Sequence, residues 1–445
     1  MKSNAEFTAA VYEKAEGLRR KQNRRNKAAK ISGIVIAPLV IAVLLITGVL
    51  RPGLIGSHNL MAGIEPQAVA PQAIDARFRA ASAEFAIELF RHANPDDKNA
   101  LISPLSIMLA LSMTQNGAGG ETLVQMQRAV GRDIPLDEMN RYLAGYVAGL
   151  DSSPEAKLAI AIAIWLRDDP SLRVHEAFLQ ANANYYNAAA YRADFASQQT
   201  AADINRWVNQ NTDGMIDGII DEIDANAIMY LLNTLAFDAK WSSVYHKENV
   251  HRDVFTGLDG QTTMVDFLRS TESHFIEGPD VTGFTKSYQG GQFNFVALLP
   301  NEGLDVREYV QSLTGEQWLS LLDNTSNTIV RTALPKFSYE YDLELKDLLA
   351  DMGMIDAFEP TADFSRMAHS QQGNIFIGSV LHKTFISVTE QGTRAAAVTS
   401  VIPAPAAGPP TRIETVILDR PFVYAIVDSQ TNLPLFIGTV MDLQP

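Results

Sequence analysis

The chain has 445 residues and no cysteine, which excludes disulfide bonds, thiolate metal sites, a cysteine nucleophile and a lipid-modified cysteine anchor. Its formal net charge is −15, but residues 1–51 carry ten Lys and Arg against three Glu, which leaves about −22 on the remainder. An acidic body repels phosphate backbones, so we expect no nucleic acid among its partners. The hydrophobic fraction of 47% is typical of a chain that folds around a packed core.

Residues 31–50 form twenty consecutive positions without a charged side chain. As a helix they would span about 30 Å, the thickness of a bilayer core. Lys and Arg are concentrated just before them, in residues 19–30, and positive flanks stay on the cytoplasmic side. We therefore predict a cytoplasmic basic tail over residues 1–30, a single-pass anchor in the lipid bilayer over residues 31–50, and a body outside the cell.

Two alternatives to an anchor stay open. A cleaved signal peptide would make the protein secreted, but its apolar region usually has about 7 to 15 residues and is followed closely by a cleavage site. The nearest small-residue site here, Ala68–Ala70, comes about eighteen residues after the apolar run. The second alternative is a buried helix of a soluble protein. The absence of cysteine favours a bacterial protein over a secreted animal one.

Residues 51–74 mix Pro, Gly, Ala and Gln without periodicity, which predicts a stalk or linker. From Asp75 to His92 apolar residues recur at helical spacing, so we expect a folded domain over residues 75–445 that begins with a helix. Helical patterns dominate its first half and short β-runs its second half, which predicts an α+β fold. The predicted strands are Phe293–Leu299, Ile375–Ile377, Lys383–Val388, Thr415–Leu418, Val423–Val427 and Leu435–Val440.

The stretch from Gly392 to Thr411 does not fit a compact domain, because it holds one charged residue and four prolines. A linker between two domains is one interpretation. However, only 34 residues follow it, and so short a strand-like segment must complete a sheet of the preceding body. We therefore predict a long exposed loop pinned at both ends. Small residues on both faces of its first part would let it enter a sheet as a new strand.

Ten short motifs in residues 75–445 resemble the serpin family of serine protease inhibitors, and they follow the family's order. They are Asn99–Ile107, Gly117–Thr122, Asn205–Val208 with Thr212–Gly214, Leu232–Phe237 with Trp241, Leu334–Phe337, Met352–Met354 with Ala357 and Phe358, Ala362–Ser365, His382 with Lys383, Glu390–Ala397, and Asp419–Phe422 with Leu435–Gly438. The resemblance implies one domain with the serpin fold: three β-sheets, eight or nine helices and an exposed reactive-centre loop.

In this family a target protease attacks the loop as a substrate and forms its acyl intermediate. Cleavage frees the loop to insert into the main sheet as a central strand, which drags the protease along and distorts its active site before the ester can hydrolyse. The resemblance therefore implies an irreversible inhibitor that is used once. It implies no enzyme activity, cofactor or metal.

The family's pattern also assigns residues within the loop. Counting its seventeen residues from Glu390 places the reactive bond between Ala406 and Ala407, with a register open by one or two residues. A small side chain before the cut fits the small S1 pocket of elastase-like serine proteases, which we expect as partners. The residues that match the hinge are Glu390, Gly392, Thr393, Ala395, Ala396 and Ala397.

Four polar residues match the hydrogen-bonded cluster under which the family's main sheet parts, and Trp241 matches the aromatic residue at the top of the opening. The alternative for all five is a structural role in the core. A hydrolase with its own active site finds no support, since the chain lacks a G-x-S-x-G elbow. A non-inhibitory serpin that acts as a cell-surface binding or structural module is the main alternative, and we expect a monomer. The four polar residues are Ser103, Ser106, Asn233 and His382.

Overall fold

The computed structural model describes residues 56–94, 97–132, 134–150, 156–371, 373–393 and 412–444. Within them, Gly56–Leu443 form one compact unit that contains nine α-helices. The helices are α3 (Ala76–His92), α4 (Pro104–Gln115), α5 (Gly120–Gly131), α6 (Leu136–Gly149), α7 (Glu176–Tyr186), α8 (Gln198–Asn211), α9 (Val306–Ser312), α10 (Gly315–Asp323) and α11 (Lys346–Asp351). Two 3₁₀ turns, Lys247–Asn249 and Asp356–Phe358, accompany them.

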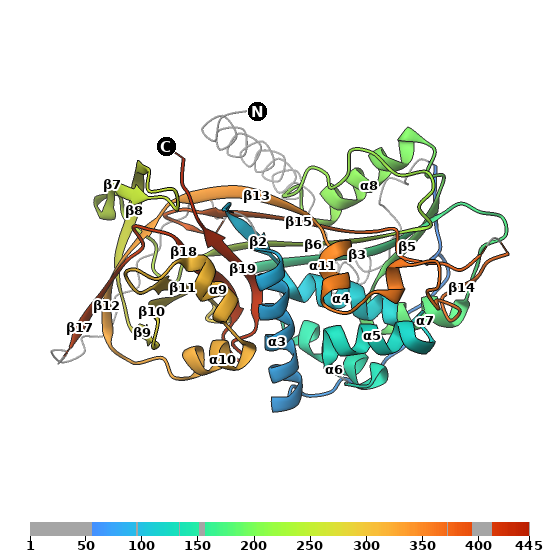
Figure 1. The fold of residues 1–445 in the computed structure, drawn as a ribbon, viewed down its shortest axis with the longest axis horizontal. Coiled ribbons are helices and arrows are strands. Elements are labelled where there is room, and N and C mark those ends of the chain that lie inside the picture. Colours follow the sequence, from blue (N-terminus) through green and yellow to red (C-terminus); the bar gives the residue numbers. More distant parts are fainter. Residues whose placement is uncertain are drawn as a thin grey trace, which may run out of the picture. The chain divides into compact units, whose positions relative to one another are not determined.

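The largest sheet has seven strands in the order β1-β5-β3-β6-β16-β15-β13 (Figure 1). Its strands are β1 (Ser57–Asn59), β3 (Ala156–Arg167), β5 (Ala189–Ala193), β6 (Met229–Lys240), β13 (Phe337–Glu344), β15 (Ser379–Val388) and β16 (Gly392–Thr393). Most neighbours are antiparallel, but β3 and β5 are parallel, and β15 and β6 run parallel where they pair directly. Strand β16 lies between β6 and β15. These two strands come from opposite halves of the body, so a segment that follows β6 by about 150 residues separates them.

Three smaller sheets complete the described fold. The six-stranded sheet is β2 (Ala100–Ile102), β19 (Pro434–Val440), β18 (Phe422–Asp428), β11 (Phe293–Pro300), β10 (Val281–Ser287) and β9 (His274–Glu277). The four-stranded sheet is β17 (Ile413–Ile417), β12 (Ile329–Pro335), β8 (Thr262–Glu272) and β7 (Val250–Thr256), and a two-stranded ladder joins β14 (Ala368–His369) to β4 (Arg173–Val174). The predicted α+β architecture with several sheets is confirmed.

Helices cover both faces of the large sheet. Figure 1 shows α4 on one side of strands β3 and β6, and α8 on the other. Helix α4 is buried along its whole length, as expected of a helix that is apolar on all faces. The predicted first helix begins where expected, because the Asp75 carboxylate accepts a hydrogen bond from Phe78 N and caps α3.

One of the six predicted strands was wrong, and two strands were missed. Residues 375–377 form no strand, since Ile377 N donates instead to Ala357 O at 2.9 Å. The first half of the body also holds the two longest strands, β3 and β6, which the sequence did not reveal. Both are central and largely buried, and a strand buried on both faces is a continuous apolar run that periodicity cannot distinguish from a helix.

The predicted stalk differs from the structure over its described part. In residues 56–74, β1 pairs antiparallel with β5, and Ser57 Oγ donates to Asp203 Oδ2 at 2.9 Å. Further along, Gln72 N donates to Arg141 O at 3.1 Å. The body therefore begins at Gly56 and not at residue 75. A three-residue polar edge strand has no pattern of its own, because its pairing depends on the partner strand.

The tail over residues 1–30 and the anchor over residues 31–50 lie outside the described residues. Across the described ranges, we find no helix that is both long enough and apolar enough to cross a bilayer.

Candidate functional site

The attached end of the predicted loop enters the large sheet. Strand β16 is antiparallel to both neighbours: Gly392 pairs with Lys240 of β6, and Thr393 pairs with Ala239 of β6 and Val388 of β15. Two residues of the loop thus already form the start of an additional central strand.

Below β16, strands β6 and β15 do not pair with each other at first, and further down they form a direct ladder. Their direct pairing runs from Ser379–Tyr230 to Lys383–Thr234 and stops there. Residues 235–238 of β6 and 384–387 of β15, which we call the seam, lie between this ladder and β16. A strand that continued from Thr393 would run along the seam and use the backbone groups that face it.

A tight turn aims the chain into the sheet. Gly392 has φ +152°, and a Cβ placed there would lie 2.0 Å from Ala239 O, so only glycine fits. Thr389 closes the turn, since its N and its Oγ1 both donate to Gly392 O, at 3.0 and 3.1 Å. Residues 389–393 contain the described part of the predicted hinge, and from here on we call them the hinge. Backbone and hydroxyl hydrogen bonds within this segment hold its turn.

Three aromatic residues hold the hinge from the body. Trp241 donates twice, from Nε1 to Thr389 O and from N to Gln391 O, both at 2.9 Å. Tyr245 N donates to Glu390 O at 2.9 Å. Tyr288 shares a 2.5 Å hydrogen bond with Thr393 Oγ1, and its ring stacks on Trp241 at 4.5 Å. Thr393 is only 2% exposed, so the first inserted side chain is already in the core.

Glu390 is tied to the neighbouring sheet by charge. Its carboxylate accepts from Lys336 Nζ at 2.8 Å. Burial pushes the pKa of Glu390 up, but the hydrogen bond and charge of Lys336 outweigh it and leave that pKa below its usual range. Lys336 follows the last residue of β12 and also lies 3.7 Å from Asp266 of β8. The ion pair therefore links the hinge to the four-stranded sheet that carries the other end of the loop.

Ser103, Ser106, Asn233 and His382 come together beneath the sheet, as the resemblance implied. Ser103 N donates to His382 Nε2 at 3.0 Å, so the ring proton sits on Nδ1 and is donated to Asn233 Oδ1 at 2.6 Å. Ser106 Oγ donates to the same oxygen at 3.2 Å. His382 and Asn233 are also a register pair in the direct ladder between β15 and β6. The cluster thus ties α4 to both strands below the seam.

Trp241, which we expected at the top of the opening and apart from the four polar residues, lies beside the hinge where the loop enters the sheet. Trp241 follows the last residue of β6, eight residues after Asn233, which is about 26 Å along an extended strand. It belongs to the hinge and not to the polar cluster. Sequence reasoning missed Tyr245, Tyr288 and the role of Lys336, because isolated tyrosines and lysines carry no sequence signal until the fold places them.

The rest of the predicted loop lies outside the described residues, including Ala395, Ala396, Ala397 and the reactive bond Ala406–Ala407. The described chain resumes at Arg412, which forms ion pairs with Glu414 and, at 3.7 Å, with Glu277 of β9. Strand β17 then pairs parallel with β12. Both ends of the loop are thus anchored, one in each of two sheets.

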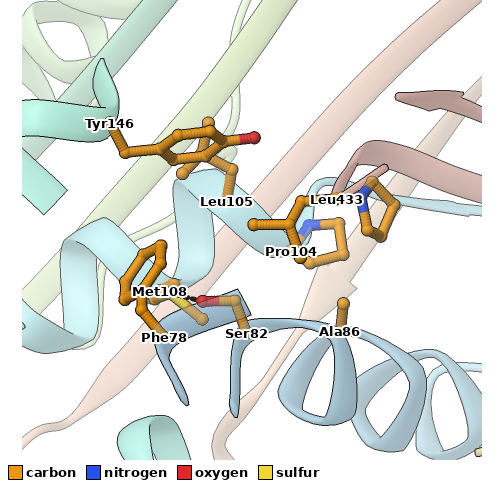
Figure 2. A pocket seen from close by; sticks show the side chains of 9 residues that line it. Phe78, Ser82, Ala86, Pro104, Leu105, Met108, Tyr146 and Leu433 are labelled. Atoms are coloured by element: carbon orange, nitrogen blue, oxygen red, sulfur yellow. Dashed lines mark hydrogen bonds between the residues drawn. The ribbon is translucent and has the colours of Figure 1, made fainter. Parts of the chain in front are cut away.

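No metal site emerges in the part of the chain that the structure describes. Its His, Asp and Glu side chains form no group of three or more that could hold a metal ion. A cavity of about 20 Å³ between α3 and α4 has an apolar lining that includes Phe78, Leu105 and Met108 (Figure 2). Ligand pockets are usually about 300 Å³ or larger, so this cavity is too small for a small-molecule ligand.

Comparison with known proteins agrees with this geometry. The family model of serpins, serine protease inhibitors, matches residues 80–443. An uncharacterized serpin-like protein of Thermococcus kodakarensis is 32% identical over 368 residues, which cover 80% of this chain and 84% of that protein. The crystal structure of tengpin, a thermophilic serpin, in its native state has a TM-score of 0.84 and 47% identity, and covers 87% of this chain and 100% of that chain. Tengpin in its latent state has a TM-score of 0.74 with 43% identity, and covers 84% and 100%.

The chain therefore belongs to the serpin family, whose members are generally protease inhibitors and not enzymes.

Proposed function

We propose that the protein irreversibly inhibits serine proteases of elastase-like specificity by inserting its cleaved loop along the seam between β6 and β15. The observation that carries the proposal is the entry of Gly392 and Thr393 between these strands, directly above the point where the direct ladder of β15 with β6 ends. In the sequence, Ala395, Ala396 and Ala397 follow, and such small side chains need little room on either face of a sheet.

Incubation with pancreatic elastase tests the inhibitory function. We expect a covalent complex that survives a denaturing gel. Thr393→Arg should be cleaved without forming the complex, because a buried unpaired charge costs several kcal/mol and slows insertion below deacylation. Thr393→Ser is the matched control, since it keeps the hydroxyl group that meets Tyr288. Cleavage of the natural chain without a complex would instead indicate a non-inhibitory binding or structural module.

The specificity has its own test. Placing the reactive bond at Ala406–Ala407 rests on counting from Glu390, and a small side chain there favours the narrow S1 pocket of elastase. Ala406→Arg should shift inhibition towards trypsin-like enzymes, whose S1 carboxylate would pair with the arginine. Mass spectrometry of the released peptide identifies the cleaved bond. A cut after Val401 or Ala404 would disprove this register but would not contradict inhibition by loop insertion.

We also propose that residues 31–50 anchor the chain in a membrane, with the inhibitory body outside the cell. Support comes from the uncharged run and from the positive charges before it. The full chain should stay with membranes after an alkaline wash, and external protease should digest the body on intact cells. The double variant Val35→Asp/Leu44→Asp should leave the membrane fraction, because each buried carboxylate opposes insertion. A natural chain released by the wash would contradict the anchor.

A further inference from the structure

Lys286 is a buried cation next to the hinge. Its side chain, on β10, is only 2% exposed, which is rare for lysine. Its Nζ lies 2.7 Å from Oε1 of Glu272, the last residue of β8, whose side chain is 14% exposed. Ser270 Oγ donates to the same carboxylate oxygen at 2.5 Å. The ammonium group therefore has one fixed anionic partner, contributed by a different sheet.

Two aromatic rings also lie near the ammonium group. Nζ lies 4.4 Å from the ring centroid of Tyr245 and 5.7 Å from that of Trp241. Both distances are within the range of a cation–π attraction. Trp241 in turn stacks on Tyr288 with an interplanar angle of 15°. Lys286 thus lies against the aromatic layer, by which we mean Trp241, Tyr245 and Tyr288.

The aromatic layer is also what holds the hinge. Its members supply the hydrogen bonds to Thr389, Glu390 and Gln391 and the bond shared with Thr393. Two of these bonds come from the side chains, namely Trp241 Nε1 to Thr389 O and the Tyr288 hydroxyl group to Thr393 Oγ1, whereas backbone amides donate the bonds to Glu390 and Gln391. A displacement of the stacked Trp241 and Tyr288 rings by a few tenths of an ångström would lengthen the two side-chain bonds together. The position of the cation therefore bears on how firmly Thr393 is seated in the sheet.

Stability alone gives a weak reason for such a pair. Removing two charges from water is costly, and a well-packed apolar pair of the same size is often as stable or more so. What an apolar pair cannot supply is a charge fixed at one point against two rings. We propose that Lys286 and Glu272 form a positioning pair, which locks the aromatic layer against the hinge and so keeps the loop's first inserted residue, Thr393, in place. The biological meaning of the inference rests on the proposed inhibitory function, but its test does not.

The absence of native cysteine allows a direct test on the full chain. A single Thr393→Cys substitution introduces the hinge thiol, and a single Ser112→Cys substitution introduces the reference thiol in α4, where the serine is fully buried. Labelling by a maleimide reports how often each position opens to solvent. Lys286→Met keeps the length of the side chain and removes the charge, and Glu272→Gln removes the opposite charge.

Adding Lys286→Met or Glu272→Gln should make the hinge thiol react about tenfold faster than in the parent, while the labelling rate of the reference thiol stays the same. Lys383→Met is the matched control, because Lys383 is also largely buried and paired with two carboxylates, yet lies lower on β15. It should change neither rate.

Three results would overturn the inference: an unchanged rate at the hinge thiol, a parallel increase at both thiols, or an equal effect of Lys383→Met. The first would mean that the pair does not act on the hinge, and the other two that it only contributes general stability. Labelling needs no protease. If elastase forms no complex but the hinge thiol responds as expected, the inhibitory function fails and the positioning role stands.

Discussion

His382 is neutral in the folded protein, because both of its ring nitrogens have fixed partners in a site without solvent. Burial lowers the pKa of His382 to about 3, well below its usual value near 6.5. The unfolded chain therefore takes up a proton on this side chain at a pH where the folded chain does not. Its contribution to stability is fully present above pH 6.5 and is lost as the pH falls towards 3.

The first prediction is that His382→Gln removes this part of the pH dependence. Between about pH 6 and pH 4 the histidine should lower the free energy of unfolding by about 1.4 kcal/mol per pH unit. Glutamine can bond Ser103 N and Asn233 without titrating. The difference between the two proteins in urea unfolding isolates the histidine from the carboxylates, which both share. Parallel pH profiles of the two proteins would show that His382 has the same pKa in the folded and unfolded chain, and would contradict its burial as a neutral group.

The second prediction concerns Gly392. Gly392→Ala combines a positive φ with a Cβ that meets Ala239 O, so we expect a loss of about 2–4 kcal/mol in the free energy of unfolding and a hinge that leaves the sheet. Gly303→Ala is the control, because Gly303 has φ +86° but nothing within 4 Å of the added Cβ. It should cost no more than about 1 kcal/mol. Equal losses would mean that the hinge has room to adjust.

At the scale of the element, the seam could be anticipated only in part. The alternation of small residues after Gly392 predicts a segment able to become a strand, and the apolar runs predict β15 and β18. The sequence does not reveal which strands flank the insertion point, because β6 and β15 are far apart in the chain and are joined by register alone. The burial of Lys286 could not be predicted for the same reason, because it depends on where three sheets meet.

The third prediction tests how residues 56–74 pack on the body. Gly145 lies inside α6, and a Cβ there would lie 2.7 Å from Gln72 O. Alanine in a helix normally stabilises by about 1 kcal/mol relative to glycine. We expect Gly145→Ala to destabilise instead, by about 1 kcal/mol, because it displaces the packed segment. Gly149→Ala, with nothing within 4 Å, should change stability by less than about 0.5 kcal/mol. A stabilising Gly145→Ala would show that the segment does not dock there.

At the scale of the whole molecule, the body joins a sheet that can accept a strand to a loop anchored at both ends. The aromatic layer holds the hinge, and with it the first two loop residues, in the sheet. The polar cluster joins β6 and β15 below the seam. On the proposed mechanism such a native state stores free energy, which is released when the cut loop continues from Thr393 and adds hydrogen bonds along the seam. We therefore predict that cleavage adds a strand to the large sheet and does not remove one.

Amide hydrogen exchange along the seam tests this claim most directly. Intact protein and protein cleaved in the loop are compared at residues 235–238 of β6 and 384–387 of β15, with α4 as the internal reference. We expect the amides that face the seam to exchange at least about a hundredfold more slowly after cleavage, because an inserted strand would add hydrogen bonds along both of its edges. Unchanged or faster exchange at these positions, with α4 unaffected, would contradict loop insertion and with it the inhibitory mechanism.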